Sequence, residues 1–131
     1  MMRAVYLDSS AVVKLAIAEA ESAALRKYLR RRRPLVSSAL ARTEVLRPLL
    51  PAGKAAVSRG REVLLALDLV RINGQVLEAA GLLLPAEVRS LDAIHLATAE
   101  LLGDDLDRIV TYDARMASAA KQIGFRITTP S

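Results

Sequence analysis

Residues 4–17 read AVYLDSSAVVKLAI and contain both kinds of element from which the rest of the fold can be predicted. The first four residues are all apolar, and a short apolar run that ends at polar residues predicts a buried strand. The polar residues 8–10 then lead into an apolar stretch, residues 11–17, that predicts a helix. A buried strand that leads directly into a helix is the repeating unit of an α/β fold with a parallel sheet.

The same alternation continues along all 131 residues, without an internal repeat or a linker. The pattern predicts strands at residues 4–7, 35–37, 69–72, 109–111 and 125–127. It predicts helices at residues 11–17, 21–31, 53–67, 91–102 and 114–123, one that carries Glu44 and ends near Pro48 and Pro51, and one from residue 74 to Pro85. Ser38 and Ser90 are the expected N-caps of two of these helices.

These elements predict one domain over residues 1–131, a three-layer α/β/α sandwich around a central, mainly parallel five-stranded sheet. Hydrophobic residues make up 53% of the chain, which indicates a packed globular core. No apolar run approaches the roughly 18 to 20 residues of a membrane-spanning helix. The N-terminus shows no signal-peptide pattern, so we expect a cytoplasmic protein with no membrane contact.

Composition and charge restrict the class of protein. Without cysteine and with a single histidine, the chain cannot form disulfides, zinc–thiolate sites or a metal site made mainly of imidazole. The net charge of +5 indicates a polyanionic partner, although the nucleotide composition of the source genome would produce the same excess of arginine. Four aromatic residues are too few for a single-strand binder built on stacked bases.

Four acidic residues stand in apolar surroundings, namely Asp8, Glu44, Asp92 and Asp113. An ionised carboxylate removed from water costs several kcal/mol unless it is paired, hydrogen-bonded or bound to a metal. Asp8 and Asp113 follow predicted strands and therefore lie at the carboxyl edge of the sheet, where ligands bind in such folds. Four carboxylates at one edge can hold Mg²⁺ or Mn²⁺, which prefer oxygen ligands. Two such ions would activate a water for attack on a phosphodiester.

Each acid also has a purely structural explanation. Asp8, Asp92 and Asp113 stand at predicted helix starts, where capping and the helix dipole favour acids. Glu44 is three residues before Arg47 and would pair with it on a solvated helix face. Spacing alone does not show that the four acids converge, so the metal site and the capping explanation both stay open.

Four segments resemble the four motifs of PIN domains, and the resemblance is closest to the VapC toxins of type II toxin–antitoxin operons. The segments are YLDSSA at residues 6–11, TEV at 43–45, SLDAIHLA at 90–97 and VTYD at 110–113. They follow the order of the family and cover essentially the whole chain. The resemblance implies a PIN-like fold and a metal-dependent endoribonuclease whose catalytic, metal-binding acids are Asp8, Glu44, Asp92 and Asp113. It also implies Mg²⁺ or Mn²⁺ as the cofactor and RNA as the substrate.

The family further implies a homodimer, or a higher toxin–antitoxin assembly, and inhibition by a small VapB-like antitoxin that inserts a segment into the active-site groove. One feature departs from the family pattern: Pro48 follows Glu44 closely. We expect this proline to shorten the helix of the second motif.

Other polar residues are candidates for contacts with substrate or partner. Ser9 and Thr111 border the acids and would hydrogen-bond a metal-bound water or a phosphate, or else cap a helix or a strand end. Lys14 is a candidate for holding substrate. A run of four cations is a candidate for binding RNA phosphates or an acidic antitoxin segment, or else for a solvated helix end. The run consists of Arg30, Arg31, Arg32 and Arg33.

His95 lies three residues after Asp92 on the same predicted helix. We interpret it as a buried, hydrogen-bonded structural histidine, because hydrolysis with two metal ions needs no histidine base. It is therefore not assigned to the predicted site.

The leading hypothesis is a metal-dependent endoribonuclease toxin, and the alternative is a non-catalytic RNA- or partner-binding module of the same fold. The alternative predicts salt-dependent binding without metal-dependent turnover. A phosphoacceptor receiver domain would need an adjacent acid pair after the first strand and a lysine after the last one. This chain has a single acid, Asp8, at the first place and no lysine in residues 125–128, so that class is set aside. The sequence leaves the RNA target open.

Overall fold

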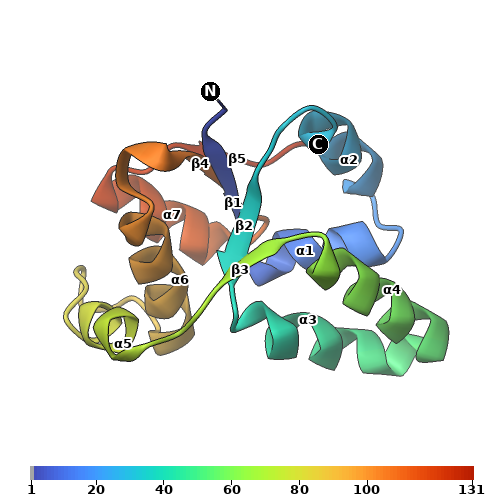
Figure 1. Ribbon diagram of the computed structural model, residues 1–131, viewed down its shortest axis with the longest axis horizontal. Coiled ribbons are helices and arrows are strands. Elements are labelled where there is room, and N and C mark those ends of the chain that lie inside the picture. Colours follow the sequence, from blue (N-terminus) through green and yellow to red (C-terminus); the bar gives the residue numbers. More distant parts are fainter. Residues whose placement is uncertain (1) are drawn as a thin grey trace.

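A five-stranded sheet forms the centre of the computed structural model, which describes residues 2–131 (Figure 1). Its strands follow the order β3-β2-β1-β4-β5, and every neighbouring pair is parallel. Their bounds are Ala4–Leu7 for β1, Leu35–Ser38 for β2, Asp68–Val70 for β3, Leu106–Val110 for β4 and Ile127–Thr128 for β5. The expected mainly parallel sheet is therefore parallel throughout.

Helices cover both faces of this sheet (Figure 1). One face carries α1 (Ser9–Ala16), α2 (Ser22–Leu29), α3 (Ala41–Leu49) and α4 (Lys54–Leu65), and the other carries α5 (Gly74–Gly81), α6 (Ser90–Leu101) and α7 (Ala114–Ile123). Two short 3₁₀ helices, η1 (Leu50–Ala52) and η2 (Gly103–Asp105), complete the elements. The predicted three-layer α/β/α sandwich is confirmed. Within residues 2–131, no helix is both long enough and apolar enough to cross a bilayer.

The central strand β1 shows why residues 4–7 are all apolar. Successive side chains of a strand point to opposite faces, so Val5 and Leu7 pack in the core beneath α1–α4, while Ala4 and Tyr6 pack in the core beneath α6 and α7. All four residues are buried. A strand covered on both faces therefore needs an uninterrupted apolar run.

The predicted strand ends are displaced where strand pairing overrides local sequence. The fourth strand begins at Leu106 rather than at residue 109, because Leu106 is already paired with Ala4 at the start of β1. The fifth strand lies at Ile127–Thr128 rather than at residues 125–127, because Ile127 is paired with Ile109. Partner strands set these limits, and the apolar pattern of one segment does not contain that information.

Two expected N-caps are wrong. Leu40 precedes α3, and the Ser38 hydroxyl instead accepts a hydrogen bond from the Leu40 backbone amide at 3.1 Å, in the turn before the helix. Arg89 precedes α6, and Ser90 is the first residue of that helix. The observed N-cap lies two residues after the serine at α3 and one residue before the serine at α6.

Pro48 does not shorten α3 as expected. The helix continues to Leu49, with Pro48 as its penultimate residue, and η1 follows directly. A proline at this position removes one backbone donor, the amide that would bond the carbonyl of residue 44, and the loss is confined to the last turn of the helix. Glu44, a full turn earlier, keeps its place on the helix.

Gly60 sets how closely α4 packs against α3. It is buried, and an added Cβ at this position would lie 2.5 Å from Cδ1 of Leu49 and 3.2 Å from Cδ2 of Leu46. Leu49 is itself fully buried, so its side chain has little room to move away. The small residue therefore reflects packing, in a helix interior where glycine is otherwise unfavourable.

We expect Gly60→Ala to destabilise the protein by about 1 kcal/mol, because an overpacking cost of about 1–3 kcal/mol exceeds the gain of about 1 kcal/mol in helix propensity. Gly81→Ala, at the end of α5, is the matched control, since a Cβ there meets nothing within 4 Å. Urea unfolding of both variants measures the difference. A more stable Gly60→Ala protein would show that α3 and α4 do not pack as described.

Candidate active site

Asp8 is buried at the carboxyl end of β1 and is the N-cap of α1. Its Oδ1 accepts hydrogen bonds from the Ser10 hydroxyl at 2.6 Å and from the Ala11 amide at 3.1 Å, and its Oδ2 accepts one from the Thr111 hydroxyl. Burial raises the pKa of Asp8, and these hydrogen bonds oppose the rise. The capping explanation is thus correct for Asp8, which is also tied to the segment after β4.

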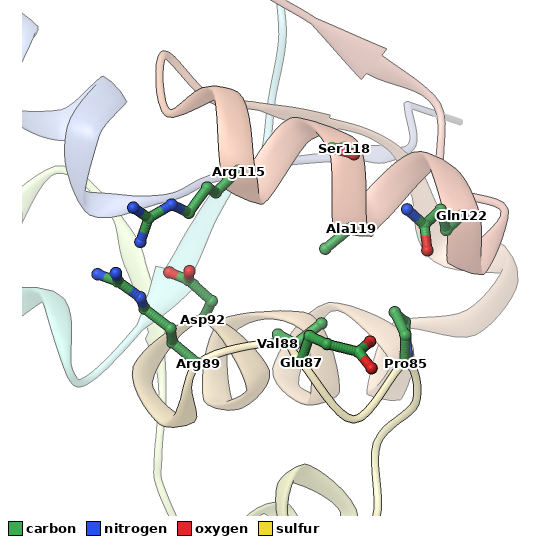
Figure 2. Close-up of a pocket in the computed structure, with 9 residues that line it drawn as sticks. All are labelled: Pro85, Glu87, Val88, Arg89, Asp92, Arg115, Ser118, Ala119 and Gln122. Carbon is green, nitrogen blue, oxygen red and sulfur yellow. The ribbon is translucent and has the colours of Figure 1, made fainter.

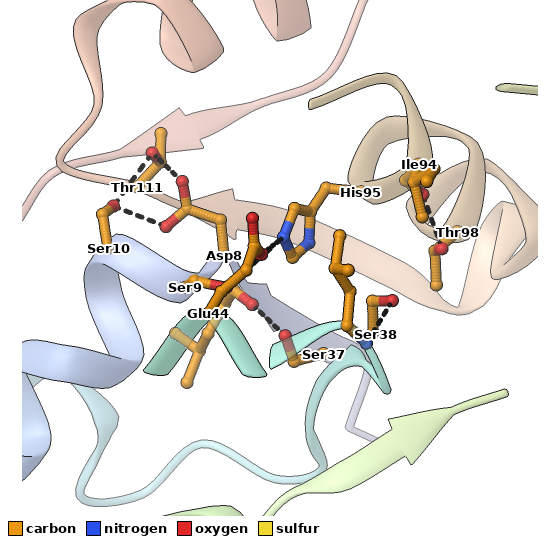
Figure 3. A network of polar contacts seen from close by, with 12 residues as sticks. Asp8, Ser9, Ser10, Ser37, Ser38, Glu44, Ile94, His95, Thr98 and Thr111 are labelled. Carbon is orange, nitrogen blue, oxygen red and sulfur yellow. Dashed lines mark hydrogen bonds and ion pairs between the residues drawn. The ribbon is translucent and has the colours of Figure 1, made fainter. Parts of the chain in front are cut away.

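Thr111 connects two of the predicted acids, and Figure 3 shows its contact with Asp8. It is fully buried just beyond β4, and its hydroxyl donates to Asp8 and accepts from the backbone amide of Asp113 at 3.0 Å. The Ser10 hydroxyl makes a similar link, because it donates to Asp8 and accepts from the Tyr112 amide at 2.9 Å. These bonds fix the segment after β4 against the start of α1.

Glu44 projects from α3 toward a hydrogen-bonded chain of side chains (Figure 3). Its Oε1 accepts from the Ser9 hydroxyl and from Nε2 of His95, both at 2.6 Å. Partial burial by itself would raise the pKa of Glu44. The hydrogen bonds from His95 and Ser9 outweigh this effect and lower the pKa below its ordinary value. Among the described residues Glu44 makes no ion pair with Arg47, so the expected surface pair is not formed.

His95 is buried between Glu44 and Tyr6 and lies within hydrogen-bond distance of both, so the prediction that it is buried and hydrogen-bonded is confirmed. Its Nδ1 lies 2.7 Å from the Tyr6 hydroxyl. Burial, followed by the charge of Asp8, raises the pKa of Tyr6 far above its ordinary value, so the hydroxyl stays protonated and donates to Nδ1. The ring then donates from Nε2 to Glu44. The predicted structural residue therefore orients one of the predicted acids.

Asp92 lies in the first turn of α6 and is partly buried. Its carboxylate accepts no hydrogen bond from any residue between 2 and 131, unlike the other three acids. Burial raises its pKa and the charge of Asp113 adds to the rise, while His95 opposes it and Asp8 and Glu44 contribute further. The net effect on Asp92 is a raised pKa.

Asp113 is the exposed N-cap of α7, where its Oδ1 accepts from the amides of Arg115 at 2.9 Å and Met116 at 3.3 Å. The capping explanation is correct for this acid as well. Its other oxygen, Oδ2, accepts no hydrogen bond within the described part of the chain.

Three of the four acids line one open pocket of about 670 Å³ at the carboxyl edge of the sheet. Its lining residues are Glu44, Arg89, Ser90, Leu91, Asp92, Asp113, Ala114 and Arg115. Asp8 does not line this pocket, but its charge raises the pKa of Asp92, which lines it. The structure therefore brings the four predicted acids to one edge, with Asp8 held deepest.

The donor chemistry of this pocket fits a hard divalent cation, although no group of three or more His, Asp or Glu side chains in residues 2–131 is already arranged to hold one. Asp8 and one oxygen of Glu44 are engaged by hydroxyl and imidazole groups. Both oxygens of Asp92 and one each of Glu44 and Asp113 accept no hydrogen bond from the described residues. A bound cation would relieve the repulsion that raises the pKa of Asp92.

Arg89 and Arg115 are two cations at this pocket that the sequence analysis did not select. Both are exposed, and neither forms an ion pair with a residue described in the structure. In Figure 2 both guanidinium groups lie beside the Asp92 carboxylate, on the same side of it. Each stands within three residues of a predicted acid in the sequence, and that proximity was the available signal.

Lys14 forms ion pairs with two glutamates that follow its own helix. Its Nζ lies 2.8 Å from Glu21 and 3.3 Å from Glu19, and 4.9 Å from the centre of the Tyr112 ring. These contacts account for the ammonium group without a substrate. A contact between Lys14 and substrate stays a prediction.

The run from Arg30 to Arg33 lies between α2 and the start of β2, at the amino edge of the sheet and opposite the acids (Figure 1). Arg32 stacks on the Tyr28 ring at 3.8 Å, and Arg32 and Arg33 donate to the carbonyl oxygens of Tyr28 and Leu29 at the end of α2. The helix-end explanation therefore holds for these two arginines. Contact of the run with RNA or an antitoxin stays a prediction.

A parallel α/β/α sandwich with acids along its carboxyl edge corresponds to a known family. A family model described as the PIN domain matches residues 5–122. Ribonuclease VapC46 of Mycobacterium tuberculosis is 60% identical to this chain, in an alignment that covers 99% of this chain and 100% of VapC46. Ribonuclease VapC47 of the same species is 36% identical over 96% of both chains. The chain therefore belongs to the PIN-domain family and, within it, to the VapC ribonucleases.

Two solved structures share the fold. The Mycobacterium tuberculosis toxin VapC20, described as cleaving the sarcin–ricin loop, superposes with a TM-score of 0.77 at 17% identity, covering 96% of this chain and 99% of that one. A chain of a toxin–antitoxin complex from Klebsiella pneumoniae gives a TM-score of 0.73 at 21% identity, covering 97% and 98%. The predicted family and the PIN-like fold are confirmed.

In the presence of EDTA we expect Asp92→Asn to raise the melting temperature by a few degrees. The neutral amide removes a carboxylate that burial and neighbouring acids oppose, as the raised pKa of Asp92 indicates. Asp68→Asn, an exposed change on β3, is the matched control and should leave the melting temperature unchanged. Differential scanning calorimetry measures both. A lower melting temperature for Asp92→Asn would show that this acid has a stabilising partner.

Proposed function

We propose that this protein is a Mg²⁺- or Mn²⁺-dependent endoribonuclease toxin in which Asp8, Glu44, Asp92 and Asp113 hold the metal. One observation carries the proposal: at the carboxyl edge of the sheet, the partly buried carboxylate of Asp92 accepts no hydrogen bond from residues 2–131 and lines one pocket with Glu44 and Asp113. A cluster of acids in a cleft, one of them with its pKa raised by burial and by its neighbours, is typical of a functional site. The identity to VapC ribonucleases supports the choice of reaction. The whole of residues 1–131 acts as one domain in this proposal.

A bound divalent metal supplies Lewis acidity and lowers the pKa of a coordinated water. The chain's own residues prepare the carboxylates for that ligand. His95 and Ser9 hold Oε1 of Glu44, which leaves Oε2 for the pocket. Thr111 and Ser10 hold Asp8, so their role is to orient an acid, and a direct contact with a phosphate is not needed.

Arg89 and Arg115 bind the phosphates of the RNA backbone in this proposal. A guanidinium group donates two parallel hydrogen bonds to a phosphate, and both arginines stand at the mouth of the carboxylate pocket. They offset the repulsion that a pocket lined with acids exerts on a polyanion. The net charge of +5 acts in the same direction at longer range.

The partners follow from the family. We propose RNA as substrate and a VapB-like antitoxin as inhibitor, with a homodimer or a higher toxin–antitoxin assembly as the quaternary form. A related fold occurs in a toxin–antitoxin complex, which supports the antitoxin. A ribonuclease toxin acts where cellular RNA is found, so the proposed location is the cytoplasm.

To test the nuclease, antitoxin-free protein is incubated with end-labelled total RNA in Mg²⁺, Mn²⁺ or EDTA. We expect discrete products with either metal and none in EDTA. Asp92→Asn should lose more than about a hundredfold in rate, more than outer-shell changes at metal sites usually cost. Asp68→Asn should retain the wild-type rate, and both variants should be folded. Cleavage by Asp92→Asn at the wild-type rate would contradict the four-acid site.

Intact RNA in every lane, together with salt-dependent RNA binding, would favour the alternative, a non-catalytic RNA-binding module of the same fold.

Metal binding has a readout that does not depend on activity. A ligand that binds only the folded state stabilises it, by about 2.7 kcal/mol at a hundred times its Kd. We expect Mn²⁺ to raise the melting temperature of the wild type, and to raise that of Asp92→Asn much less. Equal shifts in the two proteins would place the metal away from Asp92.

A further inference from the structure

A second cavity, of about 370 Å³, adjoins the carboxylate pocket between α7 and the start of α6 with the loop before it (Figure 2). The two share Arg89, Asp92 and Arg115. The second cavity reaches further along α7 and is also lined by Pro85, Glu87, Val88, Ser118, Ala119 and Gln122. A ligand that extends from the carboxylate pocket can therefore enter it without leaving the surface.

The lining changes in character from one end of this cavity to the other (Figure 2). Arg89 and Arg115 lie at the end next to Asp92, and the side chains of Val88 and Ala119 lie in the middle. Glu87, on the loop before α6, and Gln122, on α7, lie on facing walls toward the far end, where Pro85 also lies. From the end next to Asp92 to the far end, the cavity is lined first by cationic side chains, then by apolar ones, and then by side chains that form hydrogen bonds.

A nucleotide has the matching order of groups. Its phosphate needs cations, the face of its base needs an apolar surface, and the edge of its base needs donors and acceptors. The volume is at the lower end of the range for small-molecule sites, about 300–1,000 Å³, which suits a single base with its sugar. Single-stranded RNA offers such a base, because its bases can turn out of the stack.

We propose that this cavity binds the base of one nucleotide next to the cleaved phosphodiester and selects against uracil. The carboxylate of Glu87 only accepts hydrogen bonds, so it favours a base edge that carries an amino group. Adenine, cytosine and guanine each carry one. The single donor on the uracil edge, N3–H, lies between two carbonyl oxygens that repel a carboxylate. Gln122 both donates and accepts, and completes the contact with the base edge. The inference rests on the proposed ribonuclease function.

The test uses a pool of short single-stranded RNAs with a randomised centre, incubated with Mn²⁺, and the cut sites are read by sequencing. For the wild type we expect uracil to be depleted about three- to tenfold at one fixed position near the cut, the effect of about one hydrogen bond. Glu87→Gln should lose this depletion, because the amide of glutamine also donates to the uracil carbonyl groups. Glu78→Gln, an exposed change on α5, is the matched control and should keep it.

Binding in EDTA separates the two ends of the cavity. Arg115→Gln should weaken binding of the whole labelled pool in a salt-dependent manner without changing base preference, since phosphate contacts carry no sequence information. Wild-type preference in Glu87→Gln, with wild-type affinity in Arg115→Gln, would overturn the proposal and favour a protein segment as the occupant of the cavity. Absence of wild-type cleavage would overturn the proposed function and this inference together, whereas cleavage that depends on Asp92 without base preference would overturn only the inference.

Discussion

The buried carboxylate of Asp8 ties together the centre of this fold. It accepts hydrogen bonds from Ser10 and Ala11 at the start of α1 and from Thr111 beyond β4. A buried charged group that loses such a partner costs more than about 1–3 kcal/mol, so these bonds hold two neighbouring strand ends in one relative position. The start of α1 and the segment after β4, which leads to Asp113, are therefore held against each other by the chain's own hydrogen bonds.

The acids around that edge differ in their hydrogen bonds. Asp8, Glu44 and Asp113 each accept at least two, whereas the carboxylate of Asp92 accepts none from residues 2–131 and the nearby acids help to raise its pKa. A structure optimised only for stability would replace or pair such a group. Its presence beside Arg89 and Arg115 is understandable if a cation and a polyanion meet there.

Much of the fold could be predicted because its information is local. The apolar run at residues 4–7 identified a strand buried on both faces, and the helix predicted at residues 114–123 matches α7, which ends at a left-handed Gly124. Predictions failed where a distant partner decides the outcome. The start of β4 depends on Ala4 and the place of β5 on Ile109, and neither is visible within the segment itself.

The sequence by itself determined the types of element, their order, the family and the four acids, because apolar periodicity and short motifs are properties of contiguous residues. Only the tertiary structure decided what each acid contacts. In the folded chain His95 hydrogen-bonds Glu44, and Asp92 has no hydrogen-bond donor among the described residues. The cations from Arg30 to Arg33 lie at the edge of the sheet opposite the acids. Contacts between residues 51 or 103 positions apart depend on how helices pack on the sheet, and no local pattern encodes that geometry.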